Sequence, residues 1–172
     1  MRKIFFILFF KFILVICFFA QSTCELPSVT KISEHHFKLN LTNEQLKTAE
    51  NFINSHSGYS LIDTGDAGNT DYMGYLMQFQ FACWSDFNSD GKMDLLLVFA
   101  AERYKYYLVI FHGKDDGSFE QFFMHRYDYS LDGILYDENQ NKIIFGDFDN
   151  GTGFIHWDNK KNSYYIKEAI GD

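Results

Sequence analysis

The chain has 172 residues, with 15 Lys and Arg against 23 Asp and Glu, so its formal net charge at pH 7 is −8. This acidic balance argues against nucleic acid and anionic lipid as partners, because both bind basic surfaces. The length fits one domain, and the aromatic content of 19% can supply a core or an exposed contact surface.

Residues 1–22 are typical of an export signal. They carry three cations and no acid, and the stretches 4–10 and 12–20 are almost wholly apolar. Small residues at Ala20 and Ser22 fit cleavage after residue 22. Cleavage removes three cations and no acid, which leaves 150 residues with a net charge of −11. We therefore expect a secreted or periplasmic protein with no stable membrane span, and the alternative is an uncleaved segment that anchors the chain.

The remaining chain divides into an N-terminal linker or edge segment, 23–40, and a single domain, 41–172. Cys24 and Cys83 stay in a compartment that permits disulfides. They could form a bridge, or Cys83 could be a buried free thiol on the apolar face of its strand. Lipid modification of Cys24 is a third alternative, and it would anchor the protein to a membrane.

A helix is predicted over residues 43–56. Thr42 and Gln45 have the spacing of a capping box, and Gly58 can end the helix. Apolar residues recur on one helical face at Leu46, Ala49 and Ile53, whereas the opposite face is polar. We expect this helix to lie across a β-sheet and cover it.

Most of the remaining chain predicts strands. Apolar residues alternate with polar ones through 75–85, which is the period of a half-buried strand, and 95–101 is apolar on both faces, as in a central strand. Further strands are predicted at 105–112, 118–127, 133–136, 142–146, 153–157 and 163–168. The fold class predicted from this order is α+β: one N-terminal helix packed on a mainly antiparallel β-sheet, arranged as a meander, with a calcium-type loop between two strands.

That loop joins the strands over 75–85 and 95–101. Oxygen donors occupy its positions 1, 3, 5, 7 and 9: Asp86, Asn88, Asp90, Lys92 through its backbone carbonyl, and Asp94. Calcium takes six to eight oxygen ligands, and Gly91 allows the sharp bend that brings such donors together. Ca²⁺ is therefore the predicted cofactor, and an ordinary polar hairpin turn is the alternative.

The loop is not an EF-hand, because position 12 is Leu97 and both flanks predict strands. Instead it resembles the D-x-[DN]-x-D-G-x-x-D loop of the FG-GAP and VCBS repeat families. The resemblance covers about residues 75–125 and implies a calcium-bearing turn between two strands, without implying an activity. One intact motif in 150 residues is too little for a propeller, so we expect a self-contained sheet domain. Residues 146–151 echo the start of the loop, but a plain hairpin is favoured there over a second cation site.

The favoured function is that of an exported, calcium-binding, non-enzymatic domain with a protein or carbohydrate partner that the sequence does not identify. An inhibitor or immunity-type protein of an envelope enzyme is one alternative, in which a polar loop at 63–71 would enter a basic cleft. An exported hydrolase using His125 or His156 is another. The chain has neither a G-x-S-x-G nor an H-E-x-x-H motif, which argues against the hydrolase.

Overall fold

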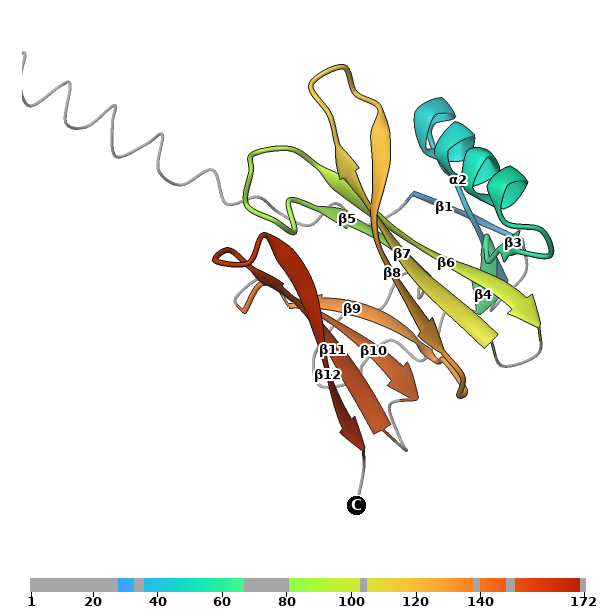
Figure 1. Cartoon of the computed structure of the whole chain (residues 1–172). Coiled ribbons are helices and arrows are strands. Elements are labelled where there is room, and N and C mark those ends of the chain that lie inside the picture. Colours follow the sequence, from blue (N-terminus) through green and yellow to red (C-terminus); the bar gives the residue numbers. More distant parts are fainter. Residues whose placement is uncertain are drawn as a thin grey trace, which may run out of the picture.

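The structure of the protein is a computed structural model, which describes residues 28–32, 36–66, 81–102, 105–137, 140–147 and 151–170. The part of the chain that the structure describes is mostly strand, arranged as three antiparallel sheets, with one helix. The predicted α+β class is therefore wrong. The fold is mainly β, and the predicted meander is divided between two sheets (Figure 1).

The larger sheet has five strands: β3 (Ser60–Leu61), β5 (Ala82–Ser85), β6 (Asp94–Glu102), β7 (Lys105–Gly113) and β8 (Phe119–Tyr127). Strands β6, β7 and β8 are consecutive antiparallel neighbours, and both β3 and β5 pair with β6. The side chains from Leu95 to Phe99 are 0% exposed, so β6 is buried on both faces, as its continuous apolar run predicts. Residues 75–80 of the strand predicted over 75–85 lie outside the described residues.

The second sheet is a four-stranded antiparallel meander. Its strands are β9 (Gly133–Asp137), β10 (Lys142–Asp147), β11 (Gly151–Asp158) and β12 (Ser163–Ile170), in the spatial order β12-β11-β10-β9. All four coincide with strands predicted from the sequence. A third, small sheet contains β1 (Val29–Lys31), β2 (His36–Leu39) and β4 (Thr64–Asp66), in the order β1-β2-β4.

The helix is α2 (Asn43–Ser55), and it confirms the helix predicted at 43–56. Its capping box is complete: the Gln45 N–H donates to Thr42 Oγ1 at 3.4 Å, and the Thr42 N–H donates to Gln45 Oε1 at 2.9 Å. Ala49 and Phe52 are buried, but Leu46, predicted on the apolar face, is 45% exposed. The buried face is therefore rotated towards Gln45 and Phe52.

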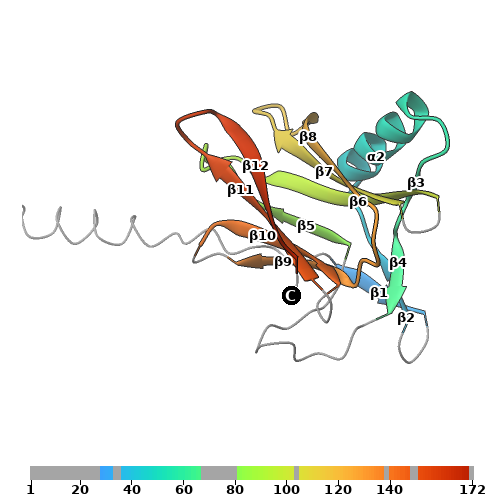
Figure 2. The ribbon, with the colours of Figure 1, turned by 60° about the horizontal axis from the view of Figure 1, so that its bottom comes forward.

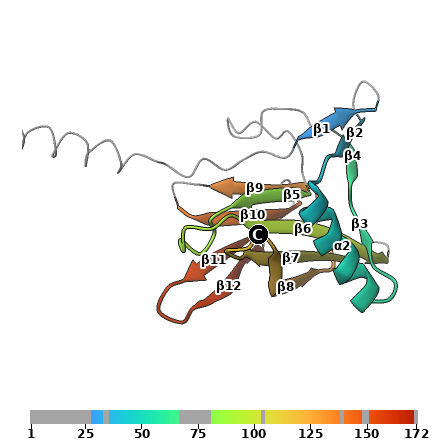
Figure 3. The same ribbon diagram turned by 90° about the horizontal axis from the view of Figure 1, so that it is seen from above.

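Two apolar cores divide the molecule into layers. One lies between the two large sheets and contains Leu96, Ile110, Phe145 and Ile155, among others. The other lies between the larger sheet and α2, around Phe52 and including Phe99 and Phe111. The order of layers is thus helix, sheet, sheet (Figures 2 and 3). The helix covers one face of the larger sheet, and the second sheet covers the other.

Candidate functional site

The loop predicted to bind calcium, residues 86–94, joins β5 to β6 at one end of the two stacked sheets (Figure 1). The turn between β7 and β8 lies at the same end, where Lys92 Nζ is 3.0 Å from Asp115 Oδ1. The turn between β9 and β10 is also adjacent, because Asn141 Nδ2 donates to the Phe87 carbonyl at 3.3 Å. The loop is therefore held by neighbouring turns from both sheets.

Within the loop, the first three predicted ligand side chains accept hydrogen bonds from the loop backbone. Asp86 accepts from the N–H groups of Asp90 at 3.0 Å and Gly91 at 2.8 Å. Asn88 Oδ1 accepts from the Asp90 N–H at 3.0 Å. The chain reverses at Ser89 and Gly91, which have φ values of 61° and 87°. The glycine at position 6 of the motif thus adopts the left-handed conformation expected of it.

The third and fourth predicted ligands, Asp90 and Lys92, differ in their surroundings. Asp90 Oδ1 accepts from the Lys92 N–H at 2.9 Å, and Asp90 Oδ2 accepts from Asn88 Nδ2 at 3.1 Å. The Lys92 side chain leaves the loop towards Asp115, and this bond raises the pKa of Lys92. Lys92 could therefore contribute its backbone carbonyl to a cation, as predicted, without placing its ammonium group there.

Asp94 is the only acidic loop residue in the core, with 0% of its surface exposed. Its Oδ2 accepts from the Phe87 N–H at 3.0 Å, and its Oδ1 accepts from the Gly113 N–H at 3.1 Å. These bonds favour the carboxylate, but burial opposes it and raises the pKa to about 7, with further upward contributions from Asp90 and Asp86. Among the described residues, no lysine or arginine forms an ion pair with Asp94.

Ser85 adds a second buried polar group beside Asp94. It is 0% exposed, and its Oγ has no hydrogen-bond partner among the described residues. Ser85 and Asp94 are directly paired across β5 and β6, so their side chains share one face of the sheet. This is the face of the core between the sheets, because it also carries Cys83 and Leu96. A buried carboxylate and an unpaired hydroxyl therefore lie next to each other.

Phe87, at position 2 of the loop, is 2% exposed and anchors the loop in the core between the sheets. Its ring packs edge-on against Tyr136 of β9, with 5.2 Å between the centroids. The Tyr136 hydroxyl donates to Asn141 Oδ1 at 2.8 Å, and Asn141 in turn donates to the Phe87 carbonyl. The second sheet therefore holds both the side chain and the backbone of Phe87.

His112, at the end of β7, is a contact of the loop that the sequence does not reveal. Asn88 Nδ2 lies 3.4 Å from His112 Nδ1, and His112 Nε2 lies 2.9 Å from the Tyr164 hydroxyl. The imidazole also stacks on Phe122, with 4.0 Å between the centroids. Burial lowers the pKa of His112. A neutral ring can accept from Asn88 at Nδ1 and donate to Tyr164 at Nε2, which connects the loop to β12.

The chemistry of the loop suits a hard cation, because three carboxylates, one amide oxygen and one carbonyl are available within nine residues. In this structure, however, the carboxylates are engaged with N–H donors. The described residues contain no group of three or more His, Cys, Asp or Glu side chains close enough to hold a metal ion. Calcium coordination would require side-chain rotations, including a turn of the Asn88 amide that brings its oxygen towards the ion.

The hydrolase hypothesis names His125 and His156, which lie on β8 and β11. His156 stacks on Tyr165, and burial together with Lys142 and Lys167 lowers its pKa. His125 lies against the core residue Phe145, with 5.2 Å between the ring centroids. Neither histidine lines the pocket described below.

Two loops and one possible disulfide, considered from the sequence, fall partly outside the described residues. In the polar loop 63–71, residues 64–66 form β4 and residues 67–71 are not described. In the second acidic turn, Asp147 pairs with Gly151 across β10 and β11, and residues 148–150 are not described. Cys83 is buried on β5, and Cys24 lies outside the described residues, so the bridge between them stays a hypothesis.

Comparisons with known proteins give this chain no relatives: no family model, no curated protein and no solved structure matches it. In the part of the chain that the structure describes, no helix is both long and apolar enough to cross a membrane.

Proposed function

We propose that the protein is an exported, non-enzymatic binding or structural domain whose loop 86–94 is stabilised by calcium. The side chains of Asp86, Asn88, Asp90 and Asp94 would hold the ion, together with the backbone carbonyl of Lys92. The ion would act by balancing charge and fixing the loop. Export rests on the signal-like residues 1–22, which precede the described part of the chain.

The observation that carries the calcium proposal is the environment of Asp94. A carboxylate with 0% exposure and no ion-pair partner among the described residues is costly to keep charged. Asp86 and Asp90 are close enough to oppose its ionisation further. A divalent cation shared by the three carboxylates would offset both the burial and the repulsion. Beside Asp94, the buried Ser85 hydroxyl also has no hydrogen-bond partner among the described residues.

A calcium ion here would also order more than its own loop. Phe87 and Asn88 connect the loop to the second sheet through Tyr136, Asn141 and His112. Cation binding should therefore stabilise the packing of the two sheets as well as the turn. This is the role of a structural metal site, in which binding free energy contributes to folding.

The test is thermal unfolding of the purified protein in calcium and in chelator. If free calcium exceeds the dissociation constant by about 100-fold, the folded state gains about 2.7 kcal/mol. For a domain of this size, that corresponds to a rise in Tm of about 5–10 °C. Asp90→Ala should abolish the rise, whereas the matched control Glu50→Ala, at an exposed helix position, should keep it. Equal melting of the wild type in calcium and in chelator would refute the metal site.

A further inference from the structure

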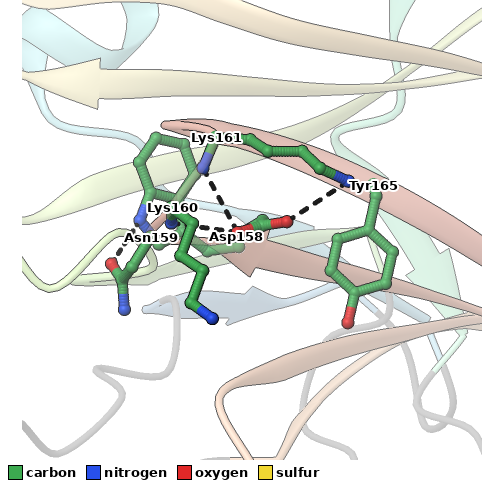
Figure 4. A pocket seen from close by; sticks show the side chains of 6 residues that line it. Asp158, Asn159, Lys160, Lys161 and Tyr165 are labelled. Atoms are coloured by element: carbon green, nitrogen blue, oxygen red, sulfur yellow. Dashed lines mark hydrogen bonds and ion pairs between the residues drawn. The ribbon is translucent and has the colours of Figure 1, made fainter.

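An open pocket of about 480 Å³ lies at the turn between β11 and β12. It is lined by Trp157, Asp158, Asn159, Lys160, Lys161 and Tyr165 (Figure 4). The pocket combines two aromatic side chains with two lysines, in a protein whose net charge is strongly negative. Neither the predicted calcium loop nor the histidines considered above account for it.

Hydrogen bonds within the turn fix the pocket. Asp158 Oδ1 accepts from the N–H groups of Lys160 at 2.9 Å and Lys161 at 3.2 Å. Trp157 Nε1 donates to Asn159 Oδ1 at 2.8 Å. The Trp157 ring is itself held between the sheets by edge contacts with His112 and Tyr164. Because these bonds and contacts form within the protein, the backbone of the turn and the side chains of Trp157 and Asn159 are positioned before any ligand binds.

The side-chain groups left for a ligand are mainly donors. Both oxygens of Asp158 are engaged, one by the turn and the other by Lys161 Nζ at 3.5 Å. The Asn159 oxygen is engaged by Trp157, so its amide nitrogen remains to donate. Lys160 forms no ion pair among the described residues. Figure 4 shows the Lys160 and Tyr165 side chains extending to the same side of the turn.

The neighbouring sheet surface is also cationic. Lys167 lies two residues beyond Tyr165 on the same face of β12, and it has no ion-pair partner in the described part of the chain. Lys142 lies opposite His156 on that face, but it is paired with Asp137 at 3.6 Å. Among the described residues, the cations near the pocket that lack an ion-pair partner are therefore Lys160 and Lys167, and both favour an anion.

Tyr165 gives the pocket a surface for ring stacking. Its side chain is 47% exposed although His156 stacks against it with 5.2 Å between the centroids. An exposed aromatic ring beside hydrogen-bond donors can stack on the apolar face of a sugar while the donors bind its oxygens. A small inorganic anion would use the lysine but not the ring.

We infer that this pocket binds an acidic sugar, with the pyranose ring on Tyr165 and the carboxylate at Lys160 and Asn159. The inference rests on the proposed role as a binding domain and names the chemical class of its partner, but it does not depend on the metal site. Because the pocket is open and one ammonium group dominates its charge, binding should be weak and salt-sensitive.

The two tryptophans of the chain provide a direct readout. Trp157 Nε1–H faces the pocket turn, whereas Trp84 packs in the core beneath α2. Titration of the ¹⁵N-labelled protein with trigalacturonate should shift the Trp157 indole resonance and leave that of Trp84 in place. The neutral trisaccharide of galactose should bind more weakly, by about tenfold, because it lacks the charged acceptor.

Two substitutions test the residues that are proposed to bind the sugar. Lys160→Gln should weaken binding of trigalacturonate by about fivefold to tenfold. Tyr165→Ala should weaken it to a similar degree, because it removes the stacking surface. Lys47→Gln is the matched control, since Lys47 is an exposed lysine on α2. An unchanged Trp84 resonance shows that each variant remains folded.

Three results would overturn the inference: equal binding of the neutral trisaccharide, full competition by inorganic sulfate at the same concentration, or binding to phosphatidylglycerol vesicles without binding to trigalacturonate. The effect of calcium on Tm is measured independently of sugar binding. Sugar binding without a calcium effect would remove only the metal proposal, and a calcium effect without sugar binding would remove only the acidic-sugar site.

Discussion

His112 on β7 and Tyr164 on β12 are joined by a 2.9 Å hydrogen bond that links the two stacked sheets beside the loop 86–94. Tyr164 is 8% exposed, and burial raises the pKa of its hydroxyl, which therefore stays protonated. Tyr164→Phe should leave His112 Nε2 without this partner and lower the free energy of unfolding by about 1–2 kcal/mol. Urea unfolding followed by circular dichroism measures the change.

Tyr165→Phe is the matched control for that prediction. Its hydroxyl lies on the outer face of the same strand, and its ring is 47% exposed. We expect it to change the stability by less than about 0.5 kcal/mol, as for most surface substitutions. Equal destabilisation by the two substitutions would mean that the His112 contact contributes nothing specific.

The sequence predicts the strands well because their apolar residues follow a simple period. The continuous run from Leu95 to Ala101 predicts a strand buried on both faces, and β6 has that environment. The same period does not show where a meander changes from one sheet to the next. Here the change follows Tyr127, where the chain turns into the second sheet at the buried residue Leu131. For this reason the predicted fold class is wrong, although the strands from β6 to β12 coincide with predicted ranges. The short strands β3 and β4 are not predicted, because two or three residues are too few to show a period.

The loop 86–94 shows a similar limit to what can be predicted about the site from the sequence. Asp86, Asn88, Asp90 and Gly91 are recognisable because their spacing within nine residues is local. His112 and Tyr164 are 24 and 52 residues from their hydrogen-bond partners, Asn88 and His112. No local pattern marks either residue, because only the stacking of the two sheets brings them together.

Gly113 should be intolerant of a side chain. Its N–H donates to Asp94 Oδ1, and a Cβ atom at this position would collide with the backbone carbonyl of Met93. Because a backbone atom cannot move aside cheaply, Gly113→Ala should destabilise the protein by about 2–4 kcal/mol and weaken any calcium effect on Tm. Thermal unfolding in calcium and in chelator measures both.

Gly117→Ala serves as a comparison for Gly113→Ala. Gly117 has a φ of 78°, and a Cβ atom there would meet nothing within 4 Å. Its cost should be limited to backbone strain of about 1 kcal/mol, without an effect on the calcium response. If Gly117→Ala lost the calcium response as well, the close approach of Gly113 to Met93 would not be the cause.

Phe87→Ala should separate the loop from the core. The ring is 2% exposed and packs against Tyr136, so its removal leaves a cavity between the sheets. We expect a loss of about 3–5 kcal/mol. Phe122→Ala, at a 44% exposed ring, should cost distinctly less. Chemical denaturation of both variants checks the order, and a larger loss for Phe122→Ala would contradict the role of Phe87 as the anchor.

The buried carboxylate of Asp94 predicts a pH dependence in chelator. Its pKa is about 7 in the folded protein, against an ordinary value of 3.8, because burial and the carboxylates of Asp90 and Asp86 outweigh the bonds from Gly113 and Phe87. Between these two values the folded state binds more protons than the unfolded state. The contribution of Asp94 to stability therefore decreases as pH rises from about 4 to 7, and it is constant above that range.

Asp94→Asn isolates this contribution from the other titrating groups. The difference in unfolding free energy between wild type and variant should shift in favour of the variant as the pH rises through the window. Saturating calcium should reverse that trend for the wild type, since the cation binds the ionised carboxylate. Urea unfolding at several pH values, in chelator and in calcium, measures both effects. A difference between wild type and variant that stays constant with pH in chelator would show that Asp94 is already ionised without the metal.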